Sequence, residues 1–202
     1  MNNGYLSAAS YFQKLAEILL RTRVSTLTAA NLLEVPLEDG ARIAVDLILS
    51  TKSASAKVQL IGNGGSAAIA SHIQNDLCDS AGIRAIVFNE APFLTAISND
   101  HGYETFFEQA IRLWSDRQDV LIAISSSGRS ESILRAARLF REKGGQIITF
   151  SGFLPDNPLS QIGNLNFYVS AQEYGFVETA HAALGHFLTD SVKAIQQAIE
   201  IR

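Results

Sequence analysis

An apolar strand that runs into a glycine-rich turn constrains this chain more than any other feature of its sequence. Residues 58–61 are mostly branched and apolar, which is typical of a buried strand. The turn 62–65 reads Gly-Asn-Gly-Gly, and at Ser66 an apolar-periodic segment typical of a helix begins. Glycines let a ligand approach the backbone closely, and a helix start offers unpaired N–H groups to an anion. The sequence therefore predicts an anion site that includes Asn63, Gly64 and Ser66.

A second strand–turn–helix unit follows some sixty residues later. Residues 119–124 form another apolar strand, and the turn after it carries Ser125, Ser126, Ser127 and Ser130. One serine is enough to cap a helix, so four hydroxyls in this turn favour binding of a phosphate. Neither turn ends in Gly-Lys-Ser/Thr or reads Gly-x-Gly-x-x-Gly, which argues against a nucleotide-hydrolysis loop and a dinucleotide site.

Composition narrows the class of protein. The chain has 202 residues, 47% of them hydrophobic and 18% charged, which fits one globular domain. The formal charge of −4 argues against a general nucleic-acid binder, which usually has a basic surface. We expect no membrane span, no signal peptide and a cytoplasmic location. The lone Cys78 excludes an intrachain disulfide and a cysteine-rich zinc site.

Strands alternate with helices through most of the chain. The periodicity predicts strands at 57–61, 84–88, 119–124, 146–150 and 165–169, and helices at 66–78, 103–114, 130–143 and 177–201. This alternation predicts a parallel sheet covered on both faces, with the turns after the strands at one edge.

Two further helices are expected before the first strand, at about 7–23 and 37–51. They have no position in the predicted alternation. Their apolar faces indicate either packing against the sheet or an interface between subunits, and the sequence leaves both interpretations open.

Titratable residues gather on two of the predicted helices. His72 and Asp76 are four residues apart and so share a helix face, as a metal or acid–base site requires. The last helix carries Glu178, His181 and His186. Glu178 and His186 are separated by about two turns, roughly 12 Å of rise. A joint site and ordinary surface or core roles both fit this spacing, and for His181 we expect a buried, hydrogen-bonded side chain.

Residues 98–102 read Ser-Asn-Asp-His-Gly, which predicts a turn. Asn99 and Asp100 would then stand near the sheet edge, where their side chains could hydrogen-bond the hydroxyls of a sugar.

Together these motifs resemble the sugar isomerase (SIS) domain family, and most closely its phosphoheptose isomerase branch. The resemblance covers nearly the whole chain and rests on the two turns at 62–66 and 124–130, on residues 96–100, and on the tail 177–181 with His186. It implies an α/β fold, a flavodoxin-like three-layer α/β/α sandwich with a five-stranded parallel sheet. Residues 1–202 would form a single domain in which 1–55 are N-terminal helices used for packing and for assembly into a homotetramer.

The resemblance also implies an activity, the isomerisation of sedoheptulose 7-phosphate to D-glycero-D-manno-heptose 7-phosphate on the way to bacterial surface polysaccharides. By position, the catalytic acid–base pair would be Asp76 and His186. Zinc or a similar divalent cation would be held by His72, Asp76, Glu178 and His186. The implied substrate contacts are Asn63, Gly64, Ser66, Asn99, Asp100, Ser125, Ser126, Ser127, Ser130 and Glu178.

The chain departs from the family pattern at three of these places. Asp76 stands where the family usually has Glu, Glu178 where it has Gln, and Arg129 where it has Asn. The carboxylate of Glu178 would strengthen cation binding but could change the substrate. The alternative is a non-catalytic SIS protein that binds a phosphosugar or a replication initiator. The retained Asp76, Glu178 and His186 favour the enzyme.

Overall fold

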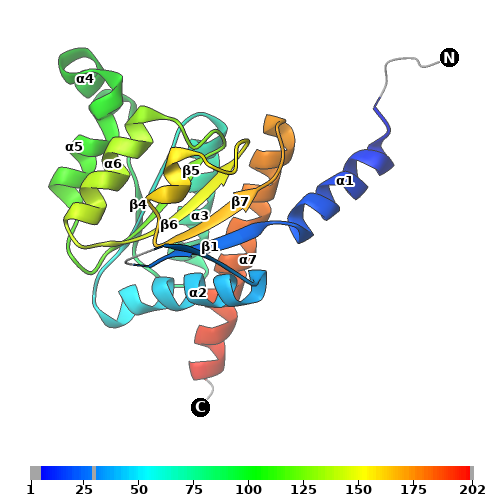
Figure 1. The fold of residues 1–202 in the computed structure, drawn as a ribbon. Coiled ribbons are helices and arrows are strands. Elements are labelled where there is room, and N and C mark those ends of the chain that lie inside the picture. The colour runs from blue at the N-terminus through cyan, green and yellow to red at the C-terminus, as the bar shows by residue number, and fades with distance from the viewer. Residues whose placement is uncertain (1–5, 29–30, 201–202) are drawn as a thin grey trace.

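The computed structural model describes residues 6–28 and 31–200, which in these ranges form one mixed sheet between two layers of helices (Figure 1). The strand order is β2-β1-β7-β6-β5-β3-β4. The strands are β1 (Arg23–Leu27), β2 (Leu32–Val35), β3 (Val58–Gly62), β4 (Ala85–Val87), β5 (Val120–Ser125), β6 (Gln146–Gly152) and β7 (Leu165–Val169). The helices are α1 (Ala8–Leu20), α2 (Leu37–Ser53), α3 (Gly65–Asp79), α4 (Ala91–His101), α5 (Phe106–Trp114), α6 (Glu131–Glu142) and α7 (Tyr174–Glu200), with two short 3-10 turns, η1 (Tyr103–Thr105) and η2 (Pro158–Gln161).

The predicted α/β sandwich is confirmed. Strands β3 to β7 all run parallel to their neighbours within this part of the sheet. Successive side chains point to opposite faces. Ile122 therefore packs into the core with α2, α3 and α7, whereas Leu121 and Ala123 pack into the core with α5 and α6. Figure 1 shows these two helical layers on either side of the sheet.

The N-terminal segment differs from the prediction of helices alone, because a hairpin lies between α1 and α2. Strand β1 pairs antiparallel with both β2 and β7, which extends the five parallel strands to seven. Val24 is only 1% exposed and faces the core of α2 and α7. Both expected helices are present, as α1 and α2. The hairpin between them was not predicted, because β1 and β2 are short and β1 joins the sheet by pairing with β7, which lies far along the chain.

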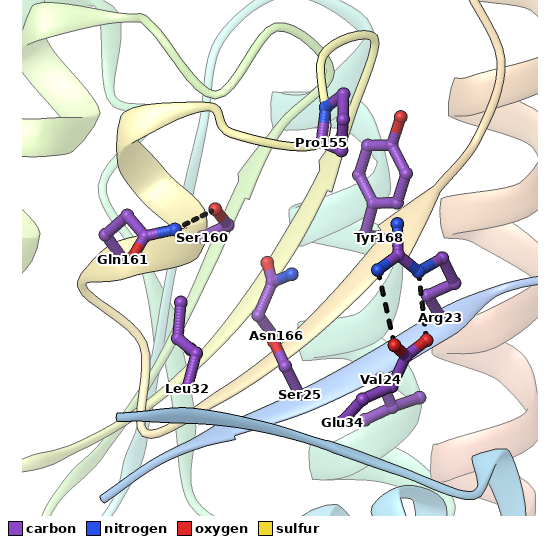
Figure 2. Close-up of a pocket in the computed structure, with 10 residues that line it drawn as sticks. All are labelled: Arg23, Val24, Ser25, Leu32, Glu34, Pro155, Ser160, Gln161, Asn166 and Tyr168. Carbon is purple, nitrogen blue, oxygen red and sulfur yellow. Dashed lines mark hydrogen bonds and ion pairs between the residues drawn. The ribbon is translucent and has the colours of Figure 1, made fainter. Parts of the chain in front are cut away.

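The hairpin also creates a pocket at its end of the sheet. The short turn η2 packs against β6 and β7 near this end of the sheet. Beneath it a pocket of about 180 Å³ opens between β1, β2 and β7, with the Arg23–Glu34 ion pair at its side (Figure 2). At its base the Asn166 Oδ1 accepts hydrogen bonds from Thr149 and Ser151, at 2.8 and 3.0 Å. Polar side chains therefore occupy the face of β7 that has no helix over it.

The predicted turn at 98–102 is also wrong, because α4 continues through it. Pro92 lies in the first turn of α4, where its missing N–H costs nothing. The helix ends only at Gly102, whose φ of +87° suits glycine. Asn99 and Asp100 are therefore exposed residues of the last helical turn, and Asn99 Nδ2 donates to Asp100 Oδ1 at 2.8 Å.

No helix among the described residues is long and apolar enough to cross a membrane.

His181 is buried, as expected. It lies at the interface of α7 with β6, where its Nε2–H donates to the carbonyl of Ser151 at 3.1 Å. Its Nδ1 is buried and has no hydrogen-bond partner among the described residues. Burial lowers the pKa of His181 to about 4, and the bond to Ser151 opposes this shift only in part. The folded protein therefore holds this imidazole neutral.

This burial predicts acid sensitivity of the fold. Below the ordinary pKa of 6.5, His181 of the unfolded chain binds a proton, whereas His181 of the folded chain binds one only at about pH 4. The contribution of this difference to the free energy of unfolding is fully present above pH 6.5. It is lost as the pH falls to 4, a change of about 3 kcal/mol for this shift. Urea unfolding at several pH values measures it.

The variant H181Q keeps a donor for Ser151 and removes the titration, so it should lose less stability than wild type in this window. The exposed His101, changed to Gln, is the matched control and should keep the wild-type profile. Identical pH profiles for H181Q and wild type would contradict the assignment.

Candidate functional site

The two glycine- and serine-rich turns lie side by side at one edge of the sheet. Strands β3 and β5 are neighbours in parallel register, with Gly62 opposite Ile124, so both turns leave the sheet at the same level. Between them is a pocket of about 170 Å³, here called the serine pocket. Its lining consists of Asn63, Ser66, Ile124, Ser125, Ser126, Ser127, Ser130, Tyr174 and Glu178. The structure thus brings together most of the substrate contacts that the resemblance implies.

Helix capping does not account for these serines. Ser130 occupies the N-cap position of α6, but its side chain makes no capping hydrogen bond. Ser66 is not a cap at all, because α3 begins at Gly65 and its N-cap is Gly64, whose φ is +56°. The hydroxyl of Ser126 is buried and has no partner among the described residues. Buried polar groups are normally hydrogen-bonded, so these hydroxyls are available to a ligand.

The serine pocket is suited to an anion. It lies at the first turns of α3 and α6, where backbone N–H groups and the helix dipoles favour negative charge. Ser125 Oγ and Ser127 Oγ accept hydrogen bonds from Gly128 N and Arg129 N, each at 3.2 Å, and so keep their hydrogens for other acceptors. The exposed Arg129 does not line the pocket.

Asn63 ties the two turns together. Its Nδ2 donates to Ser130 Oγ at 2.7 Å and to Ser132 Oγ at 3.0 Å, and its Oδ1 accepts from the Tyr103 hydroxyl at 2.6 Å. Neither Tyr103 nor Ser132 was singled out from the sequence. Both contacts depend on how α6 and η1 pack against the turn at 62–65, and no local sequence pattern predicts that packing.

Some predicted residues lie elsewhere. Asn99 and Asp100 do not line the serine pocket, because they are on α4. Gly64 lines an adjoining pocket of about 360 Å³, together with Asn63 and Tyr103. Their roles as substrate contacts stay predictions.

A second group of functional side chains forms where α3 packs against α7. His72 and Asp76 lie one turn apart on α3, and His186 reaches them from α7. Asp76 Oδ2 is 3.6 Å from His72 Nε2 and 3.3 Å from His186 Nδ1, and the two imidazole rings are 4.7 Å apart. Asp76 is half-buried between two exposed histidines. The structure therefore brings side chains of the two helices together in a compact cluster.

The cluster fits a divalent cation. One donor atom from each of its three residues lies within 4.8 Å of the others. Two imidazoles and a carboxylate are a ligand set that zinc accepts, with a further position open to substrate or water. Glu178, the fourth predicted ligand, is not part of the cluster. Its carboxylate lies in the serine pocket, against Gly65 in the first turn of α3.

A parallel sheet with two such turns at one edge defines an α/β ligand-binding domain. Residues 11–152 match the family model described as the SIS domain, and the chain belongs to this family.

Among curated relatives, it is similar to the phosphoheptose isomerase of Aquifex aeolicus, with 35% identity over 143 residues that cover 68% of this chain and 74% of the relative. The phosphoheptose isomerase of Burkholderia pseudomallei is 32% identical over 171 residues, covering 82% and 86%. In fold, the chain resembles a solved phosphoheptose isomerase from Neisseria gonorrhoeae with a TM-score of 0.78, 23% identity and coverage of 91% and 96%.

The serine pocket predicts a specific loss on removal of one hydroxyl. In S127A, binding of a sugar phosphate should weaken by about 1.5–3 kcal/mol, the value of a hydrogen bond to a charged group. The fold should survive, because Ser127 is a turn residue that is not fully buried. Isothermal titration calorimetry measures the change, with S50A on α2 as control. Unchanged affinity in S127A would mean that this serine does not bind the phosphate.

The cluster predicts about one bound zinc or similar divalent ion per chain. Because His72 supplies one of two imidazoles, H72A should lose the ion, whereas H101A, a change of an exposed histidine outside the cluster, should retain it. Elemental analysis after dialysis against zinc makes the comparison. Equal metal content in H72A and wild type would rule out the cluster as the site.

Proposed function

We propose that the protein is an aldose–ketose isomerase that converts sedoheptulose 7-phosphate to D-glycero-D-manno-heptose 7-phosphate. The observation that carries the proposal is the Asp76–His186 contact of 3.3 Å, two titratable groups held together in a chain that also has a serine pocket. The curated relatives from Aquifex aeolicus and Burkholderia pseudomallei, both named phosphoheptose isomerase, support the same activity.

The arrangement along the helices favours a long substrate. Glu178 in the serine pocket and His186 in the cluster are separated by eight residues of α7, about 12 Å of rise. A seven-carbon ketose phosphate in its open-chain form has its carbonyl at the second carbon and its phosphate at the seventh. The carbonyl that reacts and the phosphate that is bound therefore lie far apart in the substrate, as the His72–Asp76–His186 cluster and the serine pocket do in the protein.

The chemistry requires one proton to be removed and one to be returned. A base takes the proton from the first carbon while the ketone oxygen on the second carbon gains a proton, which gives an enediol. An acid then delivers a proton to the second carbon, and the hydroxyl on the first carbon gives up its proton to leave the aldehyde. Asp76 and His186 share these transfers, and their contact of 3.3 Å orients the imidazole toward the carboxylate. The serines hold the phosphate, so that the reacting carbons stay within reach.

His72, Asp76 and His186 would hold the divalent ion, with Glu178 as the fourth ligand if its side chain or a second subunit brings it near. When bound, the ion would polarise the substrate carbonyl.

The proposal extends to assembly and organisation. The whole of residues 1–202 acts as one SIS domain, in which 1–55 serve packing and the formation of a homotetramer. Helix α1 has no buried residue and extends from the body, and its Phe12 is 64% exposed (Figure 1). An apolar groove of about 270 Å³ between α1, α2 and α7 offers further surface to another copy. A monomer at micromolar concentration in light scattering would contradict the proposed homotetramer.

A cytoplasmic location belongs to the proposal as well, because a charged sugar phosphate crosses a membrane poorly.

The activity predicts a large effect on turnover from either proton-transfer group. D76N and H186Q should each lower kcat by about 10²–10⁴, with a smaller change in substrate binding. H101Q, outside the cluster, is the matched control. Incorporation of solvent deuterium next to the carbonyl reports the enediol directly and should be lost together with turnover.

If wild-type protein supplied with zinc neither exchanges deuterium nor forms product with any ketose phosphate, the non-catalytic phosphosugar-binding alternative becomes the better interpretation. The variant D76E tests the shorter acid separately, since one added methylene changes the reach of the carboxylate by about one carbon–carbon bond.

A further inference from the structure

A tyrosine outside the predicted site is connected to the serine pocket through Asn63. Tyr103 begins η1, directly after Gly102, and its Oη donates to Asn63 Oδ1 at 2.6 Å. The amide of Asn63 then presents both hydrogens of its Nδ2 to Ser130 Oγ and Ser132 Oγ, at 2.7 and 3.0 Å. The four side chains form a continuous network between two turns that are far apart in the sequence.

The donors and acceptors of this network determine where the hydroxyl hydrogen of Ser130 can point. The distance of 3.3 Å between Ser130 Oγ and Ser132 Oγ allows either hydroxyl to donate. Ser132 is 3% exposed, and no other acceptor for its hydrogen is found among the described residues, so we assign Ser132 as the donor. Ser130 therefore accepts one hydrogen bond from Asn63 and one from Ser132. A hydroxyl oxygen has two lone pairs, and both are now occupied. The hydrogen of Ser130 is the one part of its hydroxyl left for the serine pocket.

We propose that Tyr103, acting through Asn63, is a positioning residue that makes Ser130 a pure hydrogen-bond donor, so that Ser130 favours the doubly deprotonated phosphate of the substrate over the singly deprotonated one. A dianionic phosphate ester only accepts hydrogen bonds. A monoanionic ester carries one P–O–H group, which needs an acceptor that Ser130 cannot offer. The inference rests on the proposed function, since it concerns the same phosphate site.

The orientation of the Asn63 amide depends on the tyrosine. Without a donor at Oδ1, the amide could turn over and accept hydrogen bonds from the two serines, which would take their hydrogens away from the pocket. Burial raises the pKa of the Tyr103 phenol above its ordinary value, so its hydroxyl stays protonated at neutral pH and remains a donor. Tyr103 does not line the serine pocket, which makes its role indirect.

The variant Y103F removes only the hydroxyl and provides the test. Calorimetry gives the Kd of sedoheptulose 7-phosphate from pH 5 to 8, across the second phosphate pKa of about 6. Wild-type affinity should fall steeply below pH 6. In Y103F the Kd at pH 8 should rise about three- to tenfold, as for loss of one hydrogen bond, and the fall below pH 6 should be shallower. The kcat should stay within about twofold of wild type.

A second variant and a matched control sharpen the comparison. S132A removes the other hydrogen bond to Ser130 and should change affinity in the same direction, and the double variant should be less than additive. Y168F loses a hydroxyl that donates to the Phe153 carbonyl, away from this pocket, and should bind like wild type.

Other groups that titrate or carry charge near the pocket are Tyr174, Glu178 and Arg129, and all variants retain them. The ratio of variant to wild-type Kd at each pH therefore isolates the network. A ratio that is constant from pH 5 to 8, or a Kd unchanged in Y103F, would overturn the inference while wild type still binds and turns over substrate. Failure of the wild type itself to bind any sugar phosphate would overturn the proposed function instead.

Discussion

The parallel pairing of β3 with β5 is the constraint on which the rest of the structure depends. Their register sets Gly62 opposite Ile124, so the two turns leave the sheet at one level and their helices begin side by side. A shift of register would separate Asn63 from Ser130, and the hydrogen bonds between the turns would be lost. The serine pocket is thus a consequence of strand pairing in a buried sheet, where the backbone hydrogen bonds hold the alignment rigidly.

Helices α3 and α7 each carry serine-pocket residues near their start and proton-transfer residues further along. Each contributes a side chain to the serine pocket near its start, Ser66 and Glu178, and titratable groups further along. Because helices are stiff, the spacing between the anion-binding end and the proton-transfer end is set by residue count rather than by loop conformation. The shorter carboxylate of Asp76 is accommodated here, since it lies within 3.6 Å of both histidines.

Sequence patterns were sufficient where the signal is local. The buried runs and their bounding turns predicted the five parallel strands, and the helical spacing placed His72 and Asp76 on one helix face. Spacing alone left open whether residues of the last helix join them. The hairpin was missed because β1 and β2 are only five and four residues long, and because β1 joins the sheet by pairing with β7, which lies far along the chain. The turn predicted at Asn99 failed because its residues also fit the last turn of a helix. Tyr103 was missed because its contact joins parts of the chain 40 residues apart.

Gly65 has a consequence for how this family member can change over time. A Cβ at this position would overlap the carboxylate of Glu178, so the bare backbone of α3 makes room for the longer acid of α7. The two positions therefore share one small volume. A lineage that gained a side chain at 65 would displace the flexible end of residue 178, and with it the charge beside the phosphate site. A change at position 65, which itself carries no chemical group, could in this way alter the electrostatics of substrate binding.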